Sequence, residues 1–316
     1  MDFPSPRMVQ TNGIRMAVHE AGQGPAVVFC HGFPELAFSW RHQLHELGGA
    51  GYRCIAPDMR GYGGTDRPAP VEAYDMPHLT GDLVGLLDAL GLERAVFCGH
   101  DWGGAVVWEM ALRHPARVAG VVALNTPWRP RGERPTLEIL RELRGPDTYI
   151  LAFQEPNKPD ALLAEHRVRL FDRLMRRPAY TLEEFFRLPA RVRNLTLSSM
   201  VEPQPRQGEP LLTKEEMQVY LDAFGRTGFT GAINWYRNMN RNWELAANLP
   251  QRIEVPALMI SAAQDVYLPP MLTDGMEQYV PRLEKALIPQ CGHWTQQERP
   301  QETNRLILDW LRRHAS

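Results

Sequence analysis

The chain has 316 residues and a formal net charge of −2, with 44% hydrophobic and 23% charged residues, a composition typical of soluble globular proteins. So small a net charge gives no electrostatic reason to expect binding to nucleic acid or to an anionic membrane surface. At roughly 150 residues per domain, the length fits about two domains, or one large domain that carries an insertion.

Four cysteines, Cys30, Cys54, Cys98 and Cys291, lie far apart and form no C-x-x-C pair. This spacing predicts neither a disulfide framework nor a zinc site, and it favours a reducing compartment. The first ten residues contain no apolar signal segment, and no apolar run approaches the ~20 residues needed to span a bilayer. We therefore expect a cytoplasmic protein with no membrane partner.

The chain begins with a predicted hairpin and continues with strands and helices in alternation. Asn12-Gly13, at the middle of residues 8–20, predicts an antiparallel hairpin at one edge of a sheet. Short apolar runs without alternation predict strands that are buried on both faces of a parallel sheet. These runs are residues 26–30, 53–57, 95–99, 118–124 and 257–262. Leucines at helical spacing between Leu79 and Leu90, followed by Gly91, predict a helix that ends there. The pattern indicates an α/β fold.

The alternation stops after Leu124 and resumes near Pro256. Residues 128–244 contain no comparable strand run but many helical segments, which predicts a helical insertion into a core formed by residues 1–127 and 245–316. Apolar residues at helical spacing predict a last helix over residues 301–313. The insertion has 19 basic and 16 acidic residues, a net charge of +3. This charge fits an anion-attracting face or, as we favour from sequence alone, an ordinary solvated helix surface.

Residues 95–112 predict a buried strand, a tight glycine-bounded turn and a helix. The turn, Gly99-His100-Asp101-Trp102-Gly103, has the G-x-S-x-G form of a nucleophile elbow with aspartate in place of serine. The alternative is that Asp101 only caps the helix.

Three further segments favour the nucleophile. The segment His31-Gly32-Phe33-Pro34 follows the first parallel strand, where an α/β-hydrolase places an oxyanion-hole loop. We expect His31 to have a structural role and the backbone N–H of Phe33 to donate a hydrogen bond to the oxyanion. Asp265 follows a late strand, and His293 lies in the loop before the last helix. The chain order of nucleophile, acid and base is the order expected of this fold.

With these motifs the sequence closely resembles the α/β-hydrolase-fold epoxide hydrolases, which include the catalytic domain of soluble epoxide hydrolase and bacterial relatives. The segments that carry the resemblance span nearly the whole chain. They are HGFPELAFSWR (residues 31–41), PDMRGYGGTDRP (57–68), GHDWGG (99–104), LNTPW (124–128), YILAFQEP (149–156), NWYRNMNRNW (234–243) and CGHWTQQERP (291–300).

The resemblance implies a mechanism and two more site residues, Tyr149 and Tyr236, which match the tyrosines that hold the epoxide oxygen in the family's cap. Asp101 is expected to attack an epoxide carbon and form an alkyl ester. His293, oriented by Asp265, then activates water, and the backbone N–H groups of Phe33 and Trp102 stabilise the oxyanion. The implied product is a vicinal diol, made without metal or cofactor.

Two other functions remain open from the sequence: a haloalkane dehalogenase with the same aspartate nucleophile, and a catalytically silent binding protein of the same fold. His42 and His45 have a spacing that suits a metal, but no third ligand is evident, so a surface pair is favoured. For Glu35 and Cys291 the sequence does not decide between a functional and a structural role. It also leaves open the physiological epoxide, the regio- and enantioselectivity, and whether the chain forms a homo-oligomer.

Overall fold

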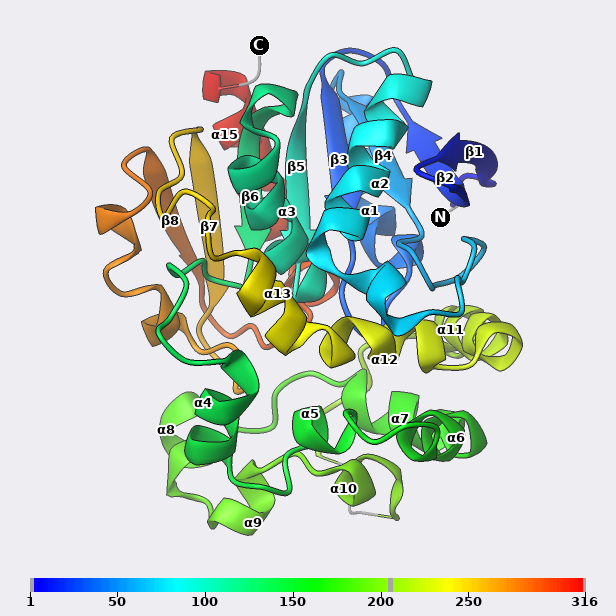
Figure 1. Cartoon of the computed structure of the whole chain (residues 1–316), viewed down its shortest axis with the longest axis vertical. Helices are drawn as coiled ribbons and strands as arrows, with labels where there is room; N and C mark the ends of the chain where they lie inside the picture. Colours follow the sequence, from blue (N-terminus) through cyan, green and yellow to red (C-terminus); the bar gives the residue numbers. More distant parts are fainter. Residues whose placement is uncertain (1–2, 204–206, 315–316) are drawn as a thin grey trace.

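The apolar runs of the sequence form the middle of an eight-stranded sheet in the computed structural model, which describes residues 3–203 and 207–314. The strands lie in the order β1-β2-β4-β3-β5-β6-β7-β8 (Figure 1). Their bounds are β1 Arg7–Thr11, β2 Ile14–Ala21, β3 Ala26–Cys30, β4 Arg53–Pro57, β5 Ala95–His100, β6 Val118–Leu124, β7 Ala257–Ala262 and β8 Leu283–Ile288. Strands β3 to β8 run parallel to one another, as predicted, and β5 is one residue longer than expected.

The predicted hairpin is confirmed at the edge of the sheet. Strands β1 and β2 pair antiparallel, and β2 then pairs antiparallel with β4. Asn12 and Gly13 form the turn with positive φ angles of 36° and 77°, a conformation that these two residue types tolerate best.

Strand β8 is not predicted by the apolar pattern of the sequence, and its burial explains why. Its sequence, LEKALI, is only partly buried because β8 is the outer strand beside β7. A half-exposed edge strand has no continuous apolar run, which is the pattern that identifies the other parallel strands.

Helices cover both faces of the sheet and divide its core in two. Alternate residues of each central strand point to opposite faces, so Val28 and Phe97 belong to one cluster of buried side chains and Val27 and Val96 to the other. The first face is covered by α2 (Met76–Ala89) and α3 (Trp102–Arg113), and the second by α1 (Arg41–Gly49) and α15 (Pro300–His314). The predicted helices near Leu79 and at residues 301–313 are therefore confirmed.

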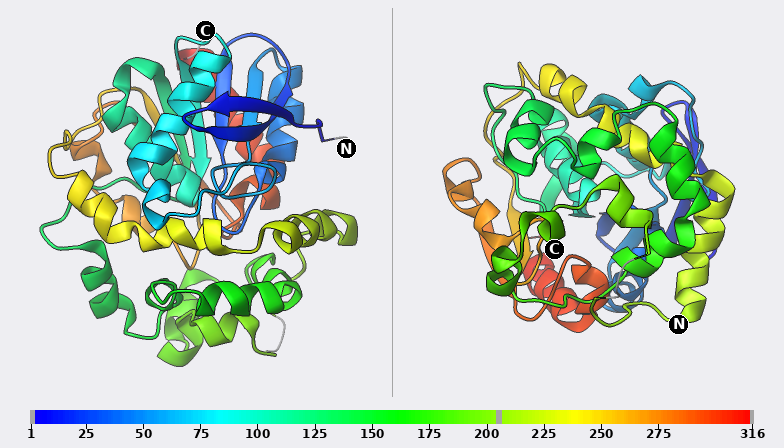
Figure 2. Two further views of the ribbon diagram at one scale, coloured as in Figure 1. Left: turned by 45° about the vertical axis from the view of Figure 1, so that its right-hand side comes forward. Right: turned by 90° about the horizontal axis from the view of Figure 1, so that it is seen from below.

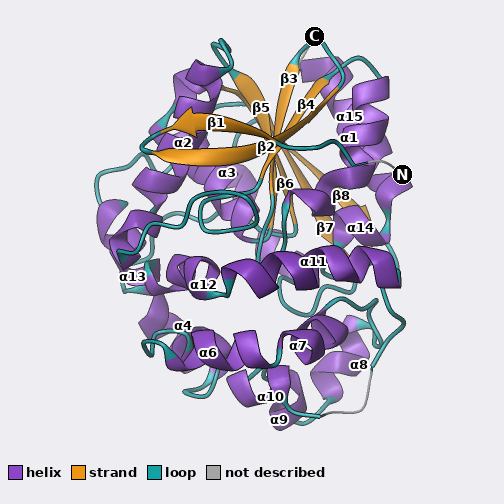
Figure 3. Cartoon of the chain, turned by 90° about the vertical axis from the view of Figure 1, so that its right-hand side faces the viewer, coloured by secondary structure: helices purple, strands orange, loops and turns teal. Residues whose placement is uncertain are grey.

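The segment between β6 and β7 is helical, as expected, and lies at one end of the sheet (Figures 1 and 2). Its helices are α4 Thr136–Arg144, α5 Tyr149–Ala152, α6 Lys158–Glu165, α7 Arg167–Leu174, α8 Leu182–Arg187, α9 Ala190–Arg193, α10 Leu197–Val201, α11 Lys214–Thr227, α12 Thr230–Arg237 and α13 Met239–Leu245. In Figure 3, α11 and α12 run between the sheet and the remaining helices. The insertion thus faces the end of the sheet where β3, β5 and β7 terminate, the usual location of an α/β active site.

The cysteines are all buried and unpaired. Among the described residues, no helix combines the length and the hydropathy that a bilayer-spanning segment requires.

Candidate active site

Asp101 occupies a strained turn between β5 and α3. Its φ and ψ angles are 52° and −120°, a backbone conformation that is rare for a residue with a side chain. The turn is possible because its neighbours are small: a Cβ on Gly103 would collide with the carbonyl group of Cys30. Such strain in a strand-to-helix turn is the property that lifts a nucleophile above the sheet.

The loop after β3 holds the Asp101 carboxylate. The backbone N–H of Phe33 donates to Asp101 Oδ1 over 2.8 Å, and a Cβ on Gly32 would collide with the Asp101 side chain, so this approach requires glycine. Thr126 Oγ1 donates to the Asp101 carbonyl oxygen at 2.7 Å. Trp102 is the first residue of α3, where backbone N–H groups lack helical partners and favour negative charge.

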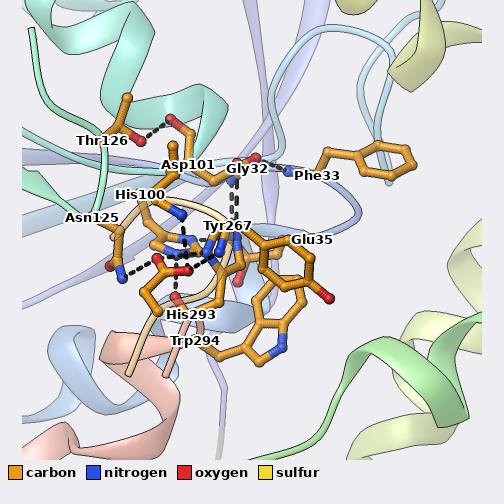
Figure 4. A network of polar contacts seen from close by, with 12 residues as sticks. Gly32, Phe33, Glu35, His100, Asp101, Asn125, Thr126, Tyr267, His293 and Trp294 are labelled. Carbon is orange, nitrogen blue, oxygen red and sulfur yellow. Dashed lines mark hydrogen bonds and ion pairs between the residues drawn. The ribbon is translucent and has the colours of Figure 1, made fainter. Parts of the chain in front are cut away.

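His293 lies between two carboxylates (Figure 4). Its Nδ1 donates to Asp265 Oδ2 at 2.9 Å, and its Nε2 is 3.8 Å from Asp101 Oδ2. The structure therefore brings together the three residues that the sequence singled out on separate segments. The hydrogen bond at Nδ1 leaves Nε2 directed at Asp101, which is the orientation that the predicted general base needs.

The Asp265 side chain is fully buried, and both of its carboxylate oxygens accept hydrogen bonds. Its Oδ1 accepts from the backbone N–H groups of Tyr267 and Leu268, at 2.9 and 3.0 Å, and its Oδ2 accepts from Asn125 Nδ2 at 2.8 Å. Burial raises the pKa of this carboxyl, but His293 and the two backbone donors outweigh burial and hold the pKa below its usual value. Asp265 is therefore a carboxylate. Neither Asn125 nor Thr126 has a role predicted from the sequence, although both lie in the LNTPW segment.

Two opposing effects set the pKa of His293. Burial lowers it, whereas the carboxylates of Asp265 and Asp101 raise it, and the net result is a pKa of about 9. One of the two carboxylates belongs to Asp101, the predicted nucleophile, so the basicity of His293 depends on the charge of Asp101.

Behind His293, Glu35 and His100 form a fully buried pair. His100 Nδ1 is 2.8 Å from Glu35 Oε2, and His100 Nε2 donates to the His293 carbonyl oxygen at 2.7 Å. Glu35 also accepts from the Gly32 backbone N–H at 3.0 Å and from the side chains of Gln296 and Gln297. The Glu35 carboxylate thus joins the oxyanion-hole loop to the loop that carries His293.

Tyr149 and Tyr236 belong to the insertion and lie side by side, close to Asp101. The two rings are 5.8 Å apart at their centroids, and Tyr236 also packs edge-to-face on Phe33 and Trp102, which flank the nucleophile loop. Burial raises the pKa of both phenols, and the nearby Asp101 carboxylate raises it further. Both side chains therefore remain protonated hydrogen-bond donors at neutral pH.

Gln154 and Arg237 connect the segments that carry the two tyrosines. Gln154 Nε2 donates to the carbonyl oxygens of Ile150 and Tyr236, at 3.0 and 3.1 Å. Arg237, the residue after Tyr236, donates to the Phe153 carbonyl oxygen at 3.0 Å and forms an ion pair with Asp160. Two segments more than 80 positions apart are therefore fixed to one another. Neither residue is singled out by the sequence.

The remaining candidates have structural contacts. His31 bridges its loop, donating from Nδ1 to the Gly32 carbonyl and accepting at Nε2 from the Met59 N–H, as expected. Burial raises the pKa of the Cys291 thiol, which makes it a poor nucleophile. His42 and His45 lie on α1, and no group of three or more metal-binding side chains is found among the described residues.

Comparisons with known proteins find relatives over nearly the whole chain. The family model for the alpha/beta hydrolase fold matches residues 25–300. Epoxide hydrolase A of Mycobacterium tuberculosis is 45% identical over 319 residues, covering 98% of both chains. Bifunctional epoxide hydrolase 2 of Sus scrofa is 42% identical; the alignment covers 96% of this chain but only 54% of the pig protein. The crystal structure of epoxide hydrolase A from Mycobacterium thermoresistibile is 44% identical, covers 98% of both chains and superposes with a TM-score of 0.88.

Proposed function

The chain belongs to the epoxide hydrolases of the α/β-hydrolase fold, and on this basis we propose how its residues convert an epoxide and water into a vicinal diol. Asp101 Oδ2 attacks one epoxide carbon and forms an alkyl ester, while the C–O bond of the ring breaks. Oδ1 stays at the Phe33 N–H, to which it already accepts a hydrogen bond. A carboxylate suits displacement at a saturated carbon because its ester product is hydrolysed afterwards.

Tyr149 and Tyr236 act on the ring oxygen. Both hydroxyls donate hydrogen bonds to this oxygen. When the ring C–O bond breaks, the oxygen becomes an alkoxide, and one of the two tyrosines transfers its proton to it. Burial raises the pKa of both tyrosines, but the same buried site also disfavours the alkoxide anion, so the ordinary difference in acidity between a phenol and an alcohol favours the proton transfer.

The second half of the reaction restores Asp101. His293 Nε2 removes a proton from water, the water oxygen adds to the ester carbonyl carbon, and the tetrahedral oxyanion forms at the N–H groups of Phe33 and Trp102. Collapse of this intermediate breaks the ester C–O bond, and the departing oxygen takes the proton from His293, which releases the diol. The proton left on the Asp101 carboxyl group returns through solvent to the tyrosinate formed in ring opening, so that the carboxylate and the phenol are both restored. Formation of the ester also removes the negative charge of Asp101, and this lowers the pKa of His293. More of the imidazole is then neutral, which is the form that can accept a proton from water.

The observation that carries this mechanism is the pair of phenols opposite a complete Asp101, His293 and Asp265 triad. We propose residues 128–244 as the cap and residues 1–127 and 245–316 as the catalytic core, so that the cap supplies the acid and the core supplies the nucleophile and base. We also propose that the protein is cytoplasmic and that its partner is a small-molecule epoxide.

Product analysis tests the proposed function against the dehalogenase alternative. The purified protein is incubated with styrene oxide and, separately, with chloro- and bromoalkanes. We expect diol from the epoxide and negligible halide release from the haloalkanes. The paired phenols fit an epoxide, whose oxygen must be protonated when the ring opens, whereas a leaving halide needs no proton donor. Halide release without diol would overturn the proposal.

A further inference from the structure

A cavity of about 660 Å³ lies between the insertion and the core, with His293 in its wall. One side is formed by α7 and the residues that follow it, and the other by the loop after β7, which includes Tyr267. Among the described residues that line this cavity, five are arginines and two are acidic: Arg169, Arg173, Arg176, Arg177 and Arg193 against Asp172 and Glu202. Part of the positive charge of the insertion thus lies at this cavity.

Most of these arginines are engaged by the protein. Arg176 forms an ion pair with Asp172 at 2.7 Å, Arg177 donates to the Glu298 carbonyl oxygen at 3.1 Å, and Arg193 donates to the Leu188 carbonyl oxygen at 3.0 Å. Arg173 is half-buried and makes no hydrogen bond or ion pair with any residue that the structure describes. A guanidinium has five donors, so a partly desolvated one without acceptors favours an anionic ligand.

The backbone next to Arg173 is hydrogen-bonded to the residue that follows His293. Leu174 accepts a 2.6 Å hydrogen bond at its carbonyl oxygen from Trp294 Nε1, and Trp294 directly follows His293. The end of α7 is therefore fixed to the loop that carries the base, and the position of Arg173 relative to His293 does not depend on a flexible segment.

Tyr267 provides a second donor in the same cavity. Its ring packs edge-to-face on His293 with centroids 5.1 Å apart, and Figure 4 shows its hydroxyl directed away from His293. The hydroxyl has no hydrogen-bond partner among the described residues, and it is accessible to a ligand because Tyr267 lines the cavity. Burial raises the pKa of Tyr267 to about 12, although the nearby positive charge of Arg173 opposes this rise. The hydroxyl therefore stays protonated at neutral pH and can donate a hydrogen bond.

We propose that Arg173 and Tyr267 form a subsite that binds a carboxylate on the substrate, so that the enzyme prefers epoxy acids whose carboxylate lies only a few bonds from the epoxide ring. The inference rests on the proposed function and specifies its substrate class. We expect the spacing to be short because the Tyr267 ring packs on His293, whose Nε2 is 3.8 Å from Asp101 Oδ2. A carboxylate is favoured because its two oxygens match the donors of one guanidinium and one phenol.

The test compares terminal epoxides of short and long carboxylic acids, such as hexanoic and undecanoic acid, each with its neutral methyl ester. We expect the wild-type enzyme to prefer the short acid over its ester by about tenfold or more in kcat/KM, mainly through KM, and to show a smaller preference for the long acid. Arg173→Met should abolish the preference, Arg173→Lys should retain part of it, and Tyr267→Phe should reduce it.

Two controls distinguish a specific subsite from misfolding and from a general loss of positive charge in the cavity. Turnover of the neutral esters should change little in both Arg173 variants, which shows that they fold and that the proposed chemistry is intact. Absence of diol from every substrate with the wild-type enzyme would instead count against the proposed function. Arg169→Met removes an exposed arginine from the same helix and cavity and should leave most of the preference. The proposal is overturned if Arg173→Met keeps the acid preference, if Arg169→Met removes it equally, or if the preference grows with chain length.

Discussion

Phe33 and Asp101, 68 positions apart in the chain, are joined by a 2.8 Å hydrogen bond from the Phe33 backbone N–H to Oδ1 of the aspartate. The same N–H serves both halves of the proposed reaction, because the oxygen that it holds in the free enzyme is the oxygen that becomes negatively charged when water adds to the ester. A donor that is already in position requires no rearrangement when this charge develops.

The paired phenols are expected to be essential for ring opening. Changing Tyr149 and Tyr236 together to phenylalanine removes both donors to the ring oxygen but keeps the aromatic packing against Phe33 and Trp102. General acid catalysis contributes roughly 10²–10⁴-fold, so we expect a loss of at least this size in the rate of ester formation, measured in a single turnover. Circular dichroism should be unchanged. Retained turnover would mean that other groups serve the ring oxygen.

The pKa of His293 should respond to the charge of the nucleophile. In Asp101→Asn, a neutral amide replaces a carboxylate 3.8 Å from Nε2, so the protonated imidazole loses a stabilising anion and its pKa should fall below about 9. An NMR titration of the His293 ring in both proteins measures this shift. An unchanged or higher pKa would show that Asp101 does not raise the basicity of His293 in the free enzyme.

Gln154 is expected to position the tyrosines without contacting the substrate. Gln154→Met removes the hydrogen bonds to the Ile150 and Tyr236 carbonyl oxygens, and the net loss of two such bonds costs about 1–2 kcal/mol of unfolding free energy. Ester formation should slow, while hydrolysis of the ester by His293 should not. Gln218→Met, which removes an exposed hydrogen bond on α11, is the matched control. Equal slowing of both half-reactions in Gln154→Met would contradict a positioning role.

Local patterns in the sequence are sufficient to predict the inner strands and the nucleophile turn. Strands β3, β4, β6 and β7 begin and end at the predicted residues because both of their faces are buried, which produces an uninterrupted apolar run. The elbow at Asp101 can be identified because its strained turn requires small neighbours at fixed positions.

Residues whose importance arises only from contacts between distant segments cannot be predicted in the same way. Asn125 contacts Asp265 across 140 positions, and Gln154 contacts Tyr236 across 82, so no local spacing indicates either role. Tyr267 follows Asp265 by two positions, but whether its hydroxyl faces the cavity depends on the path of the loop after β7. The positions of Tyr149 and Tyr236 come from the family resemblance and not from their surroundings in the sequence.

Trapping the covalent ester on Asp101 in His293→Gln is the sharpest test of the proposed mechanism, in which His293 hydrolyses that ester. Without the base, ring opening should proceed and ester hydrolysis should stop. After addition of an epoxide, mass spectrometry should then find the peptide that contains Asp101 heavier by the mass of one substrate molecule. Continued diol formation without an adduct, or an adduct on a different peptide, would contradict the mechanism.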